Sequence, residues 1–116
     1  IVYSIERIPS LSAAAAATLA RLGYPATLKV GDGSVGWPEE APFDRIIVTA
    51  AAPAVPRSLL EQLRDGGRLV MPVGGRGVQD LIAVCRRGDT SVYENLGSCR
   101  FVPLKGKEGW PLSDET

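Results

Sequence analysis

Residues Gly31–Pro53 read GDGSVGWPEEAPFDRIIVTAAAP, and this stretch decides the fold of the chain. Its glycine-rich start follows the β-branched segment 26–30, and its second half contains the apolar segment 46–49, which stops in small residues. Apolar segments without alternation are typical of strands covered on both faces, as in parallel α/β sheets. Ligands of such sheets bind beyond the carboxyl ends of the strands. The stretch therefore predicts an α/β fold with a ligand site at two strand ends.

The rest of the sequence extends this pattern in both directions. Strands are predicted over 1–5, 27–30, 44–49, 68–73, 78–86 and 91–102, and helices over 11–22 and 56–63. Ser10 is expected to cap the first helix and Gly23 to end it. Turns are predicted at Asp65–Gly67, at Gly74–Gly77 and, as a hairpin connection, at 87–89. The alternating order predicts a parallel sheet with right-handed crossovers and a closing antiparallel hairpin at one edge.

Composition limits the partners and the compartment. The chain has 116 residues, of which 13 are basic and 13 acidic, so it has the size of one domain and no basic surplus that would favour nucleic acid. No apolar run reaches the roughly 18–20 residues that span a bilayer, and the N-terminus does not resemble a signal peptide. We therefore expect a cytoplasmic protein without nucleic-acid or membrane partners. The tail 111–116 is polar and is expected to fray.

The chemistry available to the chain is restricted by two residue types. There is no histidine, which removes imidazole-centred catalysis and most zinc sites, and no metal site is expected. Cys85 and Cys99 are the only cysteines, and reduced core thiols are favoured over a disulfide.

The first residues, Ile1–Ile5, form a predicted strand with no preceding turn or cap. Because chain termini usually lie at the surface, the sequence indicates a domain whose N-terminal part is missing. We expect the unpaired edge of this strand to favour self-association.

Gly31–Gly36 matches the pattern G-x-G-x-x-G after a predicted strand. The dinucleotide fingerprint requires a helix to begin at its third glycine, whereas Gly36 is followed by Trp37 and Pro38, so we reject a phosphate-binding loop. Asp32 is suited instead to accept from an adenine amino group, with the Gly33 backbone close to the ring edge. An ordinary Asp-Gly turn is equally consistent with the local sequence.

Other positions are weighed in the same way. Glu6, at the end of the first strand, is suited to bind the vicinal hydroxyls of a ribose, although position alone favours a solvated charge. The small residues Thr49–Pro53 leave room for a ligand or form a tight turn. Gly74–Gly77 is more typical of a flexible turn than of an anion-binding loop. Trp37 and Trp110 are expected to pack on the surface, and Lys105, Lys107 and Glu108 to form a solvated segment.

Four segments together carry a resemblance that none of them carries alone. They are VYSIER at 2–7, the 31–53 stretch, LLEQLRDGGRLVMPVG at 59–74 and RFVPLKGKEGW at 100–110. In this order they resemble the bacterial protein-L-isoaspartate O-methyltransferases. The resemblance runs from Val2 to Trp110, so we assign 1–110 to a partial methyltransferase domain and 111–116 to the tail.

The resemblance implies a Rossmann-like methyltransferase sheet, incomplete at its N-terminus, and S-adenosyl-L-methionine as cofactor. The implied reaction methylates the free carboxylate of L-isoaspartyl or D-aspartyl residues in damaged proteins, and the ester collapses to a succinimide that reopens as aspartate. The residues matching the cofactor site are Glu6, Arg7, Asp32, Gly33, Thr49 and Ala50. Those matching the substrate cleft are Ala51, Ala52, Pro53, Val102, Pro103 and Leu104.

The resemblance also implies what this chain lacks. The glycine-rich cofactor loop is expected about 20 residues before Glu6, and the active-site hydroxyl still further upstream, so no catalytic residue is assigned within the chain. Lys105 stands where some relatives have a hydroxyl residue. We expect weak or no cofactor binding by these residues alone. The alternatives are a non-catalytic, truncated nucleotide-binding or self-associating domain and, disfavoured by the missing helix after Gly36, a nucleotide-dependent oxidoreductase.

Overall fold

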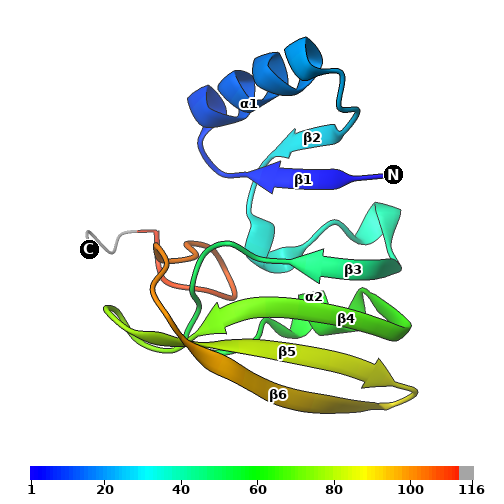
Figure 1. The fold of residues 1–116 in the computed structure, drawn as a ribbon, viewed down its shortest axis with the longest axis vertical. Coiled ribbons are helices and arrows are strands. Elements are labelled where there is room, and N and C mark those ends of the chain that lie inside the picture. The colour runs from blue at the N-terminus through cyan, green and yellow to red at the C-terminus, as the bar shows by residue number, and fades with distance from the viewer. Residues whose placement is uncertain (113–116) are drawn as a thin grey trace. The chain divides into compact units, whose positions relative to one another are not determined.

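The computed structural model describes residues 1–112, which divide into two compact units, Ile1–Gly33 and the residues from Ser34 onward (Figure 1). Residues 113–116, most of the predicted polar tail, lie outside the described part of the chain. Within residues 1–112, no helix is long and apolar enough to cross a membrane.

The first unit is a β-α-β element. β1 (Tyr3–Glu6) pairs in parallel with β2 (Thr27–Val30), so the carboxyl ends of both strands lie at the same edge. α1 (Pro9–Leu22) connects them, and its many alanine residues have the highest intrinsic helix propensity. This part of the predicted order is confirmed.

The two ends of α1 test the predicted caps. Gly23 ends the helix in the left-handed conformation, with φ of 77°, as predicted. The predicted cap at Ser10 is wrong, because the helix begins two residues before the predicted start, at Pro9, and Ile8 occupies the cap position without a side-chain hydrogen bond. Proline has no N–H to leave unsatisfied in the first turn, so it starts the helix without a capping side chain.

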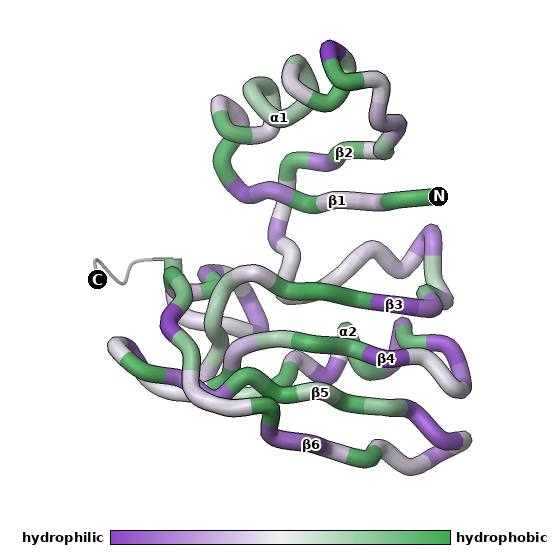
Figure 2. Tube along the Cα trace, viewed as in Figure 1, coloured by the Kyte–Doolittle hydropathy of each residue, from purple (hydrophilic) through white to green (hydrophobic). Residues whose placement is uncertain are grey.

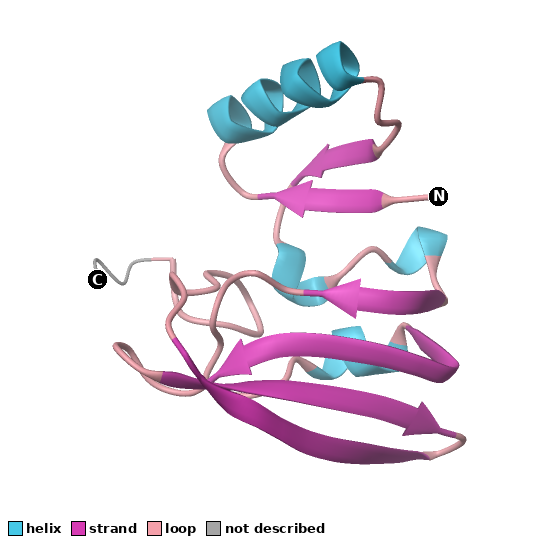
Figure 3. Ribbon diagram, viewed as in Figure 1, coloured by secondary structure: helices cyan, strands magenta, loops and turns pink. Residues whose placement is uncertain are grey.

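The second unit contains one four-stranded sheet in the order β3-β4-β5-β6 (Figure 3). Its elements are β3 (Phe43–Ile47), α2 (Arg57–Glu61), β4 (Leu63–Val73), β5 (Gln79–Arg87) and β6 (Thr90–Cys99). β3 and β4 are parallel, whereas β4, β5 and β6 are successively antiparallel. The predicted element order and the closing hairpin are therefore confirmed.

The core of this unit lies between α2 and the sheet. Apolar residues run along β3, β4 and β5 in Figure 2. The buried cluster consists of Ala52, Leu59, Leu63, Leu69, Met71 and Val84. α2 contributes one of these side chains and β4 contributes three, because alternate residues of β4 face the helix. This core holds the carboxyl ends of β3 and β4 in place.

Several predicted boundaries move. The largest shift is at β4, which begins at Leu63 rather than at residue 68, so the turn predicted at Asp65–Gly67 lies within this strand. β3 and α2 are each two residues shorter at the C-terminal end than the predicted 44–49 and 56–63. Leu63 belongs to β4 and pairs with Phe43, which stops α2 at Glu61. β6 stops at Cys99 rather than at residue 102, because the following segment pairs with residues beyond β3.

The cysteines differ in part from the prediction. Cys85 and Cys99 are free thiols, but both are only half-buried rather than core residues. Cys85 lies on β5 opposite Arg68, whose Nη1 lies 3.9 Å from its Sγ, and Cys99 ends β6 at the margin of the sheet.

Candidate functional site

The carboxyl edge of the first unit brings two predicted acids to one place in the fold. Glu6 is the last residue of β1 and lies opposite Val30, and the Gly31 N–H donates to the Glu6 carbonyl oxygen at 3.1 Å. Asp32 therefore follows the end of β2 directly beside the end of β1. Both acids are half-buried. This is the edge at which ligands of parallel sheets bind.

Arg7 and Gly33, also predicted for the cofactor site, show no local feature that points to a ligand. Arg7 follows Glu6 and is exposed. A methyl group at Gly33 would lie 3.9 Å from the Ile5 Cβ, which is an ordinary contact. The structure therefore gives no steric requirement for glycine at residue 33.

The helix that a phosphate-binding loop requires after its third glycine does not form here. Gly33–Val35 forms a single 3₁₀ turn and Gly36 has φ of 68°, after which no α-helix begins. The loop is held by Gln62 at the end of α2: its Nε2 donates to the Val35 carbonyl at 2.9 Å, and its Oε1 accepts from the Trp37 N–H at 2.8 Å. Gln62 is 7% exposed, so its buried amide, rather than solvent, provides the hydrogen bonds to these two backbone groups of the loop. Nothing in the local sequence marks it.

Beyond β3, Ala51 and Ala52 are inserted between two other segments. The Ala51 N–H donates to the Val102 carbonyl, and the Leu104 N–H donates to the Ala51 carbonyl, both at 2.7 Å. Ala52 bonds on its other side to Pro72 and Gly74, which end β4. Both alanines are essentially inaccessible to solvent, at 1% and 0% exposed.

This insertion joins most of the residues predicted for the substrate cleft. Ala51 also forms a parallel bridge with Pro103, so the segment 102–104 lies along residues 51–52. Pro53 and Thr49 are exposed and Ala50 is half-buried. Because both side chains are enclosed, a larger side chain at residue 51 or 52 would have to displace its neighbours.

A cavity of about 240 Å³, which we call the sheet-end cavity, opens where these segments meet the β4–β5 turn. Its principal lining residues are Ala51, Arg76, Gln79, Phe101, Pro103 and Trp110. The Arg76 guanidinium carbon lies 5.4 Å from the centre of the Trp110 ring. Trp110, expected to pack on the surface, thus forms part of a cavity wall, and the turn Gly74–Gly77 forms another.

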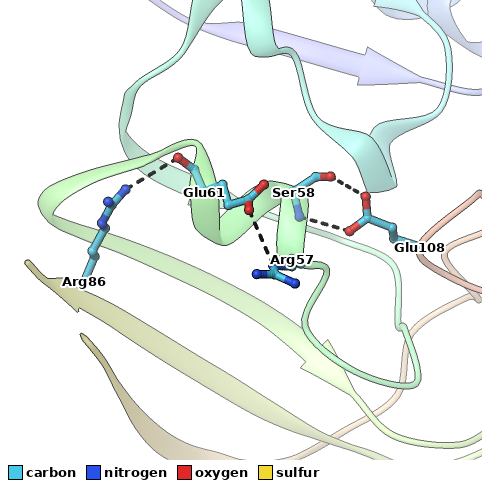
Figure 4. Close-up of polar contacts among 5 residues, drawn as sticks. All are labelled: Arg57, Ser58, Glu61, Arg86 and Glu108. Carbon is cyan, nitrogen blue, oxygen red and sulfur yellow. Dashed lines mark hydrogen bonds and ion pairs between the residues drawn. The ribbon is translucent and has the colours of Figure 1, made fainter. Parts of the chain in front are cut away.

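The segment predicted to be solvated contains a specific anchor. Glu108 accepts hydrogen bonds from the backbone N–H of Ser58, at 2.9 Å, and from the Ser58 hydroxyl (Figure 4). Its own N–H donates to the Oγ of Ser34 at 3.0 Å, and Ser34 is fully buried. Partial burial raises the pKa of Glu108, but the hydrogen bonds from Ser58 and the charge of Lys107 outweigh it, so this pKa lies below its usual value.

Comparison with known proteins identifies the sequence pattern. Residues 1–109 match the family model described as protein-L-isoaspartate(D-aspartate) O-methyltransferase. The chain is 52% identical over 114 residues to a protein-L-isoaspartate O-methyltransferase of Chlorobaculum tepidum, covering 98% of this chain and 54% of that protein. The chain thus spans about half the length of the curated relatives it matches.

Solved structures agree with this match. One protein-L-isoaspartate O-methyltransferase superposes with a TM-score of 0.83 at 29% identity, covering 94% of this chain and 35% of that one. Another, from Plasmodium falciparum in complex with S-adenosyl-L-homocysteine, superposes with a TM-score of 0.76 at 24% identity, covering 90% and 52%. The predicted Rossmann-like α/β fold is confirmed by both neighbours.

Proposed function

The chain belongs to the protein-L-isoaspartate(D-aspartate) O-methyltransferase family, and we propose that it takes part in methyl transfer to the free carboxylate of L-isoaspartyl or D-aspartyl residues in damaged proteins. The methyl donor we propose is S-adenosylmethionine. The observation that supports this proposal is the parallel pairing of β1 with β2, since Glu6 ends β1 and Asp32 follows β2 at the same edge.

The residues of this edge fit an adenosine group by their chemistry. A carboxylate accepts two hydrogen bonds, so Glu6 suits the two hydroxyls of a ribose. Asp32, the second residue after β2, suits the amino group of adenine as a second acceptor. The S-adenosyl-L-homocysteine in the Plasmodium falciparum relative supports an adenosine-containing ligand for this fold.

The substrate side is proposed at Ala51–Pro53 and Val102–Leu104. A peptide would lie at the exposed Pro53 and Val102, because Ala51 and Ala52 are themselves covered by neighbouring segments of the chain. S-adenosylmethionine supplies, when bound, a methyl group on a cationic sulfur. A carboxylate is ionised at neutral pH and needs no general base, which suits a chain without histidine. The task left to these residues is to orient the carboxylate and to exclude water.

The adenosine half of the proposal is tested by titrating the ¹⁵N-labelled chain with S-adenosylmethionine. We expect weak binding, with amide shift changes concentrated at Glu6, Asp32 and Gly33, and a several-fold loss of affinity in Glu6→Gln. Glu94→Gln, on the exposed face of β6, is the matched control and should bind as the unmodified chain does. Equal affinity in Glu6→Gln, or shift changes elsewhere only, would refute the assignment of this edge.

A further inference from the structure

The sheet-end cavity lies within the second unit, and its walls are joined by one buried side chain. Gln79 is 3% exposed, and its Nε2 donates to the Gly75 carbonyl while its Oε1 accepts from the Phe101 N–H, at 2.9 and 2.8 Å. This amide thus ties the β4–β5 turn to the segment that leaves β6. Because its oxygen and its nitrogen both bond to the chain itself, Gln79 holds the cavity open between two fixed walls.

Most of the side chains that line this cavity are apolar. Ala51, Phe101, Pro103 and Trp110 contribute carbon surface, and two of these side chains are aromatic. The turn contributes glycines, which leave the space unfilled: a methyl group at Gly75 would meet nothing within 4 Å. The lining therefore favours a ligand that is recognised by apolar contact.

Arg76 is the one charged side chain among the described lining residues, and it is already engaged within the chain. Its guanidinium carbon lies 5.4 Å from the centre of the Trp110 ring, within the range of a cation–π contact. A guanidinium is weakly hydrated and stacks on aromatic faces, so it is compatible with an apolar neighbour. We assign no ion pair between Arg76 and a ligand.

The size and the position of the cavity indicate what it would bind. Its volume of about 240 Å³ lies below the roughly 300–1,000 Å³ typical of pockets for drug-sized ligands, so it suits a single side chain. Phe101 and Pro103 line it, whereas Val102 between them is 68% exposed and does not. A peptide lying at Val102, as proposed, would therefore pass directly beside the cavity.

On the basis of the proposed function, we infer that the sheet-end cavity binds a large apolar side chain, best an aromatic one, of a residue flanking the isoaspartate, and that Phe101 is a specificity-determining residue for such peptides. Phe101 is 39% exposed, so a bound ring would cover apolar surface that water now contacts. Packing of a ring against Phe101 or Trp110 in an offset or edge-to-face arrangement adds to this gain. A small polar side chain would gain neither contribution and would lose hydration.

The test uses three isoaspartyl peptides of equal charge, with phenylalanine before the isoaspartate, phenylalanine after it, or serine at both positions. Normal aspartyl versions of all three are included, and binding to the 116-residue chain is measured by calorimetry at low and high salt. We expect one phenylalanine peptide to bind about tenfold more tightly than the serine peptide, because a cavity open on one side buries a ring only in part. The preference should be the same at both salt concentrations, since no ion pair forms.

Two variants assign the preference to the cavity. Phe101→Ala removes the ring but keeps the backbone N–H that bonds to Gln79, so the wall should remain in place. We expect this variant to lose most of the phenylalanine preference and to bind the isoaspartyl serine peptide as the unmodified chain does, whereas a collapsed wall would weaken both. Tyr93→Ala, which removes a 54% exposed aromatic side chain of β6 outside the lining, is the matched control and should keep the preference.

Equal affinity for the three isoaspartyl peptides, a preference that survives in Phe101→Ala, or an equal loss in Tyr93→Ala would overturn the inference. If isoaspartyl peptides bind more tightly than aspartyl ones without any effect of phenylalanine, the proposed function stands and the inference fails. A phenylalanine preference that depends on Phe101, with equal binding of isoaspartyl and aspartyl peptides, would support the apolar cavity and refute the proposed function. Binding of none of the peptides would overturn both.

Discussion

Glu108 and Ser58 lie 50 residues apart in sequence and are joined by two hydrogen bonds, one from the Ser58 N–H and one from its hydroxyl. The carboxylate thereby satisfies an N–H at the start of α2, where negative charge is favourable. The same residue donates its own N–H to Ser34. Glu108 thus fixes the 104–110 loop, which carries Trp110 and one wall of the sheet-end cavity, to the core of the second unit.

Replacing Glu108 by glutamine should lower the free energy of unfolding by about 1 kcal/mol. The amide oxygen can still accept from the Ser58 N–H without the charge, but the amide NH₂ can only donate to the Ser58 hydroxyl oxygen. The half-exposed position keeps the loss near the value for a neutral bond rather than a buried ion. Urea unfolding followed by tryptophan fluorescence measures it. Glu94→Gln, which removes an exposed glutamate from β6, should leave the unfolding midpoint unchanged. A loss in the control as large as in the variant would contradict a specific role for Glu108.

The same contact makes stability depend on pH. The pKa of Glu108 is lower in the folded chain than its usual value, so its contribution is present above about pH 4.3 and is lost as the pH falls through the lower, folded pKa. The unmodified chain should therefore approach the stability of Glu108→Gln on acidification from about pH 6 to about pH 3. Urea midpoints of both chains over this range give the comparison. A constant difference between them would show that Glu108 is not the titrating group.

Gly109 should tolerate no larger side chain. A methyl group there would overlap the carbonyl oxygen of Leu104, which accepts the Trp110 N–H at 2.7 Å. We expect Gly109→Ala to cost about 2 kcal/mol or more, since the clash is with backbone that closes the loop. Gly75→Ala is the matched control, because a methyl group at Gly75 meets nothing within 4 Å. Thermal unfolding that ranks the two variants equally would contradict this geometry.

Most elements of the fold followed from local patterns. The apolar segments before Gly31 and Ala50 became β2 and β3, and Gly23 ended α1, because each depends on neighbours in sequence. Predicted element boundaries were wrong where a distant segment of backbone offers other hydrogen bonds. The segment after Cys99 leaves β6, for example, because it pairs with residues 51–52.

The site was predictable only in part, for the same reason. The position of Glu6 and Asp32 at one edge followed from the predicted parallel strands, whose carboxyl ends meet there. Gln62, Gln79 and Glu108 were missed as structural anchors, since a polar residue that satisfies a loop 20 or more residues away has the same local appearance as a solvated one. The burial of Gln62 and Gln79 depends on segments that are distant in sequence, so the local sequence does not indicate it.

The edge of β3 is the last feature with a testable consequence. Among the described strands, β1 pairs only with β2 and β3 only with β4, so each has a side open to another strand. Ile47, at the end of β3, is 77% exposed. An open edge beside exposed apolar side chains favours pairing between chains.

We therefore predict that the 116-residue chain self-associates and that Ile47→Lys weakens association about tenfold, or about 1.4 kcal/mol, because the charge must be desolvated when a second strand pairs there. Folding should be unaffected at so exposed a position. Val78→Lys is the matched control: Val78 is 57% exposed but precedes β5 in the turn, away from the edge of β3. Sedimentation velocity over a concentration series measures both variants. A chain that stays monomeric, or two variants that weaken association equally, would refute the role of this edge.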